Sequence, residues 1–190
     1  MSPWEIAFLL SLAVVLLAAV VSDLRSRRIP NVLVFFGLAL GVFFQSASPH
    51  GVQLFFRPWG SIGALNSLYG LLVGLAIFLP FYILRTLGAG DVKLLAMLGV
   101  WFGPYAMVGV ALLTSLSGGI LALVVALWNR SLGQVLKNIN FMMTDSLMQI
   151  MVSGRTVIQT PVKTTGRLPY AVAIASGAAI EVVLLKGWYR

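Results

Sequence analysis

One stretch near the N-terminus, WEIAFLLSLAVVLLAAVV at residues 4–21, decides the fold class of this chain. Glu5, near its start, is the only charged residue within it. An α-helix over this stretch covers about 27 Å, which is close to the roughly 30 Å hydrocarbon core of a bilayer. The stretch therefore predicts a transmembrane helix.

The residues after this run indicate its orientation. Arg25, Arg27 and Arg28 follow the apolar residues, and no Lys or Arg precedes them. A cleaved signal peptide would carry its positive charge before the apolar run. Because positive residues mark the cytoplasmic side, we expect a retained helix whose N-terminus lies outside the cytoplasm.

Further apolar runs follow, separated by proline, glycine or charged residues. Hydrophobic residues make up 59% of the 190 residues and charged residues only 9%, too few to cover the surface of a soluble domain. We therefore expect an all-α, polytopic membrane bundle of about six transmembrane helices, built as a single domain over residues 1–190. The further runs are about 32–47, 65–84, 92–102, 105–128 and 170–185.

The segment 131–167 differs from these runs and is predicted to be a cytoplasmic loop. Apolar residues recur at helical spacing over 131–154, with polar residues between them. This pattern is typical of an amphipathic helix that lies on a membrane surface. With this topology only Arg57, Lys186 and Arg190 of the positive residues face outside, which agrees with the orientation of the first helix.

The composition excludes several kinds of site. The chain has no cysteine, so it has no disulfide and no thiol nucleophile, and its single histidine, His50, cannot build a histidine-rich metal site. The net charge of +8 is interpreted as topology signals and contacts with anionic lipid. We expect no metal, no cofactor and no nucleic-acid partner.

Two of the five acidic residues, Asp23 and Asp91, each adjoin a membrane helix at a break in the apolar sequence. A carboxylate at the bilayer centre costs about 2.5–3.5 kcal/mol on insertion scales, so this position favours a functional role. Two crossings separate the aspartates, which places both on the same side of the membrane in either orientation. Glu5 and Glu181 are instead expected near helix ends, where a carboxylate can reach water.

Two neighbouring carboxylates cannot both ionise easily and therefore share a proton. One can then act as a general base toward water while the other protonates the leaving amine, which is peptide hydrolysis without metal, thiol or histidine. Gly88 and Gly90, beside Asp91, allow close approach of another chain. A flexible turn between two helices is the structural alternative for these glycines.

Three segments carry a resemblance to a known family. Residues 88–93, GAGDVK, resemble the G-x-G-D-x-K signature of type IV prepilin peptidases. Residues 22–31, SDLRSRRIPN, resemble that family's aspartate motif, which ends in Ile-Pro-Asn and here includes Pro30 and Asn31. Pro169 and Tyr170 are similar to its Pro-Tyr segment, although Ala171 stands where the family usually has glycine.

The resemblance implies a membrane aspartic endopeptidase that cuts the short basic leader from prepilin-like or pseudopilin substrates at the cytoplasmic face of a bacterial inner membrane. Asp23 and Asp91 match the catalytic positions, whereas Gly88, Gly90 and Lys93 match supporting motif positions. The short, cysteine-free chain resembles the tight-adherence (Flp-type) subgroup. Larger members carry a cytoplasmic cysteine domain and also N-methylate pilin, so the resemblance leaves methyltransferase activity doubtful for this chain.

Two other classes of protein fit parts of the pattern. In a small proton- or cation-coupled transporter subunit, Asp23 and Asp91 would relay protons or bind cations. A transport path needs sites near the bilayer midplane, and both aspartates at one face argue against it. A non-catalytic pilin-assembly factor would keep its function when both aspartates become asparagine.

Overall fold

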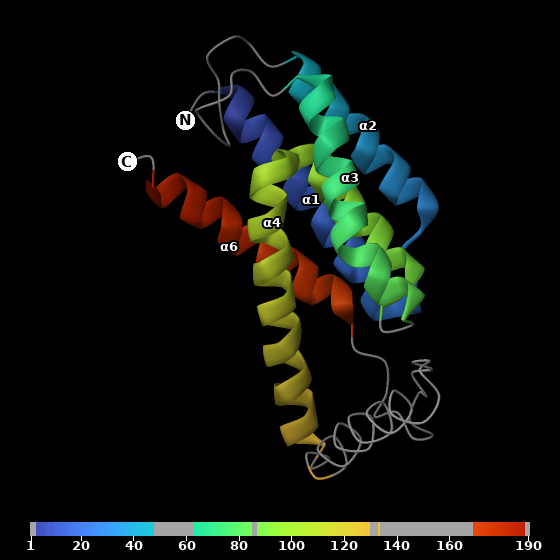
Figure 1. Cartoon of the computed structure of the whole chain (residues 1–190). Coiled ribbons are helices and arrows are strands. Elements are labelled where there is room, and N and C mark those ends of the chain that lie inside the picture. The colour runs from blue at the N-terminus through green and yellow to red at the C-terminus, as the bar shows by residue number, and fades with distance from the viewer. Residues whose placement is uncertain (1–2, 48–62, 85–86, 130–132, 134–168, 189–190) are drawn as a thin grey trace, which may run out of the picture. The chain divides into compact units, whose positions relative to one another are not determined.

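The structure, a computed structural model, describes residues 3–47, 63–84, 87–129, 133 and 169–188. Every regular element in these residues is an α-helix, which confirms the all-α prediction (Figure 1). Residues 48–62 and the predicted amphipathic helix at 131–154, apart from Gly133, lie outside the described residues. The helices are α1 (Pro3–Ser26), α2 (Asn31–Ala47), α3 (Ala64–Ile83), α4 (Ala89–Trp128) and α6 (Tyr170–Trp188).

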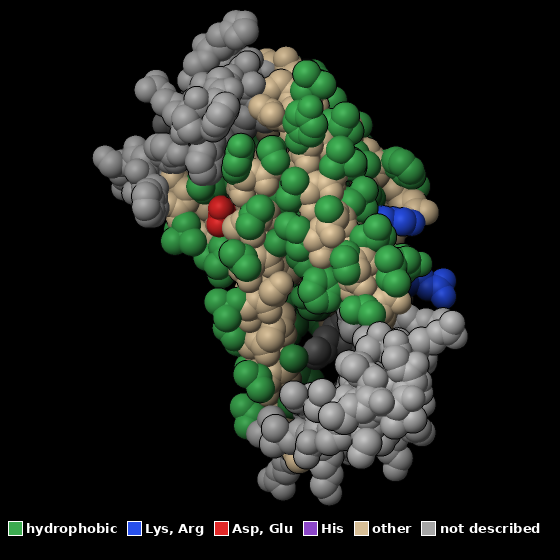
Figure 2. All heavy atoms as spheres, viewed as in Figure 1, with side chains coloured by type: hydrophobic (Ala, Val, Ile, Leu, Met, Phe, Trp, Pro, Cys, Tyr) green, Lys and Arg blue, Asp and Glu red, His purple; other side chains and the backbone are tan. Residues whose placement is uncertain are grey.

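The described helices have the surface of a membrane protein. Three of them, α1, α3 and α4, are long and apolar enough to span a bilayer, while α2 and residues 170–185 form shorter apolar helices. Large apolar side chains such as Val32, Phe35 and Leu112 are exposed, and green hydrophobic atoms dominate the described face in Figure 2. Exposed apolar area on this scale is expected where lipid, rather than water, surrounds the helices.

The chain reverses direction inside α4, at the predicted break. Gly103 has φ 74° and ψ 175°, which is outside the helical region, and Pro104 follows it. Asp91 lies in electrostatic range of Tyr170, and Gly118 also touches Tyr170. A straight helix would hold residues 91 and 118 about 40 Å apart. The first arm of α4 therefore runs up to Gly103, and the second arm turns back from it; Figure 1 shows this reversal within α4.

Two side-chain hydrogen bonds to backbone carbonyl groups stabilise the chain near this reversal. Because proline has no N–H and Gly103 is not helical, carbonyl groups before the break lose helical partners. Gln45 Nε2 donates to the Trp101 carbonyl at 2.6 Å, and Trp101 Nε1 donates to the Gly37 carbonyl at 2.9 Å. Both side chains are buried, so these bonds fix the first arm of α4 against α2.

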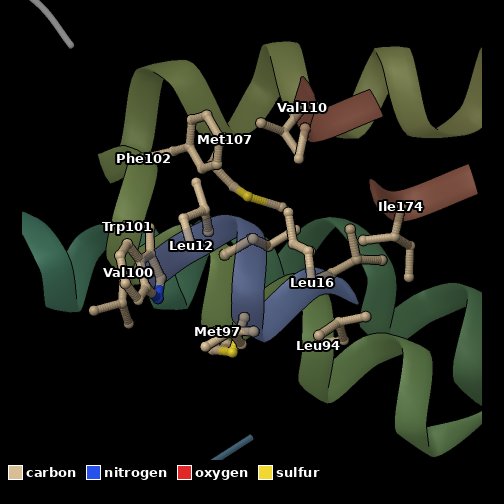
Figure 3. Close-up of a cluster of buried hydrophobic side chains, with 14 of the residues drawn as sticks. Leu12, Leu16, Leu94, Met97, Val100, Trp101, Phe102, Met107, Val110 and Ile174 are labelled. Atoms are coloured by element: carbon tan, nitrogen blue, oxygen red, sulfur yellow. The ribbon is translucent and has the colours of Figure 1, made fainter. Parts of the chain in front are cut away.

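Glycines let the first arm of α4 approach two other helices. Gly70 of α3 lies directly against the backbone of Gly99, and a side chain on Gly41 of α2 would meet Trp101 Nε1 at 2.9 Å. Small residues at such contacts bring helix backbones together where no hydrophobic effect drives association. The buried cluster around them includes Leu12, Leu16, Leu94, Met97, Trp101, Met107 and Ile174 (Figure 3).

Candidate active site

Asp23 lies in the last turns of α1, which continues beyond the apolar run to Ser26. Its side chain is buried, with 7% exposed. The residue after the helix, Arg27, has φ 53°, and its N–H donates to the Asp23 carbonyl at 2.9 Å. Ser22 Oγ donates to the Arg28 carbonyl at 2.8 Å and helps to hold the turn that follows.

The partner of the Asp23 carboxyl comes from the far end of the chain. The backbone N–H of Ala171, in the first turn of α6, donates to Asp23 Oδ2 at 3.1 Å, and α1 and α6 are neighbours in the fold. The first N–H groups of a helix have no partner within it, and they carry the positive end of its dipole. Asp23 therefore caps α6, and α6 stabilises a negative charge on Asp23.

Asp91 is held by its own helix. The Gly88 N–H donates to Asp91 Oδ2 at 3.2 Å, and the Gly88 carbonyl accepts the N–H of Asp91 at 3.1 Å and of Val92 at 3.3 Å. An acidic side chain three residues after the N-cap is half of a capping box. The predicted break at 88–93 is consequently shorter than expected, because α4 already begins at Ala89.

The structure brings the two carboxyl groups together. Asp91 is close enough to Asp23 for their charges to repel, and it is half-buried where Asp23 is buried. Tyr170 joins them from α6, with its hydroxyl in electrostatic range of Asp91. Three residues from segments far apart in the sequence thus lie near one another where α1 ends and where α4 and α6 begin.

The two aspartate motifs also pack on each other. A Cβ atom on Gly90 would meet Ile29 Cβ at 3.4 Å, an ordinary contact distance, so the turn after α1 lies against the start of α4. Lys93 Nζ donates to Asn31 Oδ1 at 3.1 Å and joins the starts of α4 and α2. The carbonyl of Pro30 accepts the N–H of Leu33 and so begins α2. These motif residues therefore position the segments that carry the aspartates.

The start of α6 contains the other two motif residues. The Pro169 carbonyl accepts the Val172 N–H at 3.2 Å and begins the helix. Two contributors to this region are absent from the predicted site: the Ala171 N–H and Gly118, which lies against the Tyr170 ring. A backbone N–H has no signature in a sequence. A glycine inside an apolar helix does indicate close approach, but it does not identify the partner.

Besides Asp23, Glu181 is an acidic side chain that the helices bury, contrary to the expectation that it reaches water. It is 9% exposed and lies directly against Gly109 of α4. It follows Tyr170 by eleven residues in α6, about 16 Å along the helix, so it stands apart from Asp23 and Asp91. Among the described residues no group of three or more His, Asp or Glu could hold a metal ion.

Comparison with known proteins gives two matches. Residues 10–123, which include both aspartates, match the type IV leader peptidase family. Over 133 residues the chain is 32% identical to the type 4 prepilin-like proteins leader peptide-processing enzyme of Escherichia coli O78:H11 (strain H10407 / ETEC). That match covers 65% of this chain and 44% of the enzyme, so the chain spans less than half of that relative's length. No solved structure matches.

Proposed function

Because the chain belongs to the type IV leader peptidase family, we propose that it is an aspartic endopeptidase that removes the short basic leader from type IV prepilin-like proteins. The observation that carries the proposal is the approach of Asp91 to Asp23 at the ends of two membrane helices. Placing two acidic side chains in one partly buried site of a membrane protein costs free energy. The whole sequence has only five acidic residues, and two of them lie here. A catalytic pair accounts for that cost.

The two carboxyl groups have complementary parts in the proposed reaction. The ionised one takes a proton from a water molecule, and the resulting hydroxide attacks the scissile carbonyl carbon. The protonated one donates a hydrogen bond to the carbonyl oxygen and then transfers its proton to the leaving amine, so the C–N bond breaks as the amine gains that proton. Asp23, whose carboxyl accepts the Ala171 N–H at the start of α6, is assigned the part of the base, and Asp91 the part of the donor.

The charge pattern supports a cytoplasmic position for this pair in a bacterial inner membrane. Arg25, Arg27 and Arg28 lie beside Asp23, and positive residues favour the cytoplasmic side. A prepilin leader is basic and its following segment is an apolar helix. Such a substrate would place its cleavage site near the interface, where the described ends of α1 and α4 carry the two aspartates.

The test is leader removal from a purified prepilin by wild type, Asp23→Asn and Asp91→Asn, with the new N-terminus identified by mass spectrometry. Asparagine keeps the shape of the side chain but cannot ionise or transfer a proton. Each substitution is expected to lower the cleavage rate by at least about 10³-fold. Glu181→Gln is the matched control, because it neutralises a buried acid that lies away from the pair.

Three outcomes separate the interpretations. Cleavage by wild type and Glu181→Gln, but by neither inserted aspartate variant, supports the catalytic pair. Cleavage by a well-inserted aspartate variant removes that aspartate from the reaction. If wild type leaves every prepilin intact while both aspartate variants abolish ion-driven uptake into vesicles, the chain is a transporter rather than a peptidase.

A further inference from the structure

Tyr170 stands beside the aspartate pair without a part in the reaction described so far. Its ring is half-buried, and its hydroxyl lies in electrostatic range of Asp91. Among the described residues no hydrogen bond joins that hydroxyl to either carboxyl group, whereas each carboxyl accepts a backbone N–H. Within the described residues the hydroxyl thus stands beside the pair without a bond to it, where it can donate to a group that binds there.

The position of this hydroxyl depends on a glycine in the returning arm of α4. A Cβ atom on Gly118 would lie 2.8 Å from Tyr170 Cε2 and 3.1 Å from its Oη. Real Cβ atoms almost never come that close to another atom, so the ring occupies space that any other residue at 118 would fill. Gly118 is buried, and its neighbour Gly119 faces away and is exposed.

The backbone beside Tyr170 is fixed to the same site. The next residue, Ala171, is fully buried and bonds Asp23 through its N–H. The ring is thus held at one end by the start of α6 and at its edge by the flat face of α4 at Gly118. Such double support is what a catalytic donor requires, because preorganised groups need no reorganisation during the reaction.

We propose that the Tyr170 hydroxyl donates a hydrogen bond to the scissile carbonyl oxygen as negative charge develops on it, and that Gly118 is the residue that positions this hydroxyl. The proposal rests on the peptidase function proposed above. Attack of water converts the carbonyl to a tetrahedral centre, and the pair of electrons displaced from the C=O bond collects on that oxygen. Asp91 and Tyr170, on adjoining elements, would share this charge.

Tyr170→Phe tests the hydroxyl alone, since phenylalanine keeps the ring and its packing. Loss of one such donor lowers kcat by about 10²-fold, with KM changed by less than about threefold, because the bond forms mainly in the transition state. A purely structural role would instead lower the thermal midpoint and leave the kcat of the folded fraction unchanged. An unchanged kcat for Tyr170→Phe overturns the proposal.

Gly118→Ala and Gly119→Ala test the positioning residue as a matched pair. Both replace glycine by alanine in one helix and gain the same helix propensity, but only the first meets Tyr170. Gly118→Ala is expected to lower kcat by about tenfold or more, and Gly119→Ala to leave it at the wild-type value. Equal kcat values for the two variants overturn the assignment of Gly118.

The double variant Gly118→Ala/Tyr170→Phe separates an effect through the hydroxyl from an independent one. If Gly118 acts by placing that hydroxyl, the double variant is no slower than Tyr170→Phe alone. A product of the two single effects would show that Gly118 acts elsewhere. Wild type and Asp91→Asn accompany every assay. If wild type does not cleave, the proposed function and this inference both fail. If wild type cleaves and Asp91→Asn does not, but the Tyr170 and Gly118 variants keep the wild-type kcat, this inference alone fails.

Discussion

Asp23 and Asp91 reach the same place by opposite routes. Asp91 is held by the N–H of Gly88, three residues away and immediately before its own helix. Asp23 is held by the N–H of Ala171, which lies 148 residues away in the sequence. One half of the site is a local capping motif, and the other half exists only when the first and last helices pack together.

This difference explains how far each half could be foreseen. Gly88 and Asp91 have the spacing of a capping box, so their contact follows from local rules. The apolar runs and the break at Gly103–Pro104 likewise predict the described helices and their ends to within a few residues. Each of these features depends on neighbours in the sequence.

The distant contacts of the site depend on tertiary packing, which cannot be predicted from the pattern of a single sequence. Nothing near Asp23 indicates that Ala171 will bond it, because every non-proline residue has an N–H. Gly118 is one of 19 glycines, and its contact with Tyr170 requires α4 to reverse at Gly103. The burial of Glu181 has the same origin, since Gly109 makes room for it only after that reversal.

Because the hydrogen-bond partner of Asp23 is distant and that of Asp91 is local, the position of the Asp23 carboxyl should depend on α6 more strongly than the position of the Asp91 carboxyl depends on any distant segment. Ala171→Pro removes the N–H that Asp23 accepts, and proline is tolerated in the first turn of a helix. Loss of a hydrogen bond to a charged group corresponds to about 1.5–3 kcal/mol, so cleavage should fall by roughly 10- to 100-fold.

Ala171→Gly is the control for this substitution, because glycine keeps the N–H. It should cleave at close to the wild-type rate in the same prepilin assay. Equal losses for the glycine and proline variants would mean that the alanine side chain, and not its N–H, supports Asp23.

A smaller effect should separate the two glycines beside Asp91. A Cβ atom at position 88 would lie 3.1 Å from Asp91 Oδ2, whereas one at position 90 would meet Ile29 Cβ at an ordinary 3.4 Å. Gly88→Ala should therefore displace the carboxyl group and lower kcat by about two- to tenfold, while Gly90→Ala stays near wild type. A larger loss for Gly90→Ala would show that the Asp91 half depends on the distant turn at Ile29 and is not a local motif.

The smallest effect is expected at the bond between Lys93 and Asn31. Both side chains are exposed, and the bond measures 3.1 Å. Lys93→Met and Asn31→Ala should each lower the free energy of unfolding by less than about 1 kcal/mol in detergent, and together by no more than the larger single effect. Additive losses would show that the two side chains act independently.

The most direct test asks whether Asp23 and Asp91 meet at all. The chain has no cysteine, so Asp23→Cys/Asp91→Cys carries the only two thiols. Treatment with a short bifunctional thiol reagent in native membranes should link them and change the mobility of the chain on a gel. The control Leu17→Cys/Asp91→Cys, with Leu17 63% exposed on another face of α1, should remain unlinked. Efficient linking of the first pair alone is the predicted result; equal linking of both pairs, or of neither, would contradict a single site formed by the two aspartates.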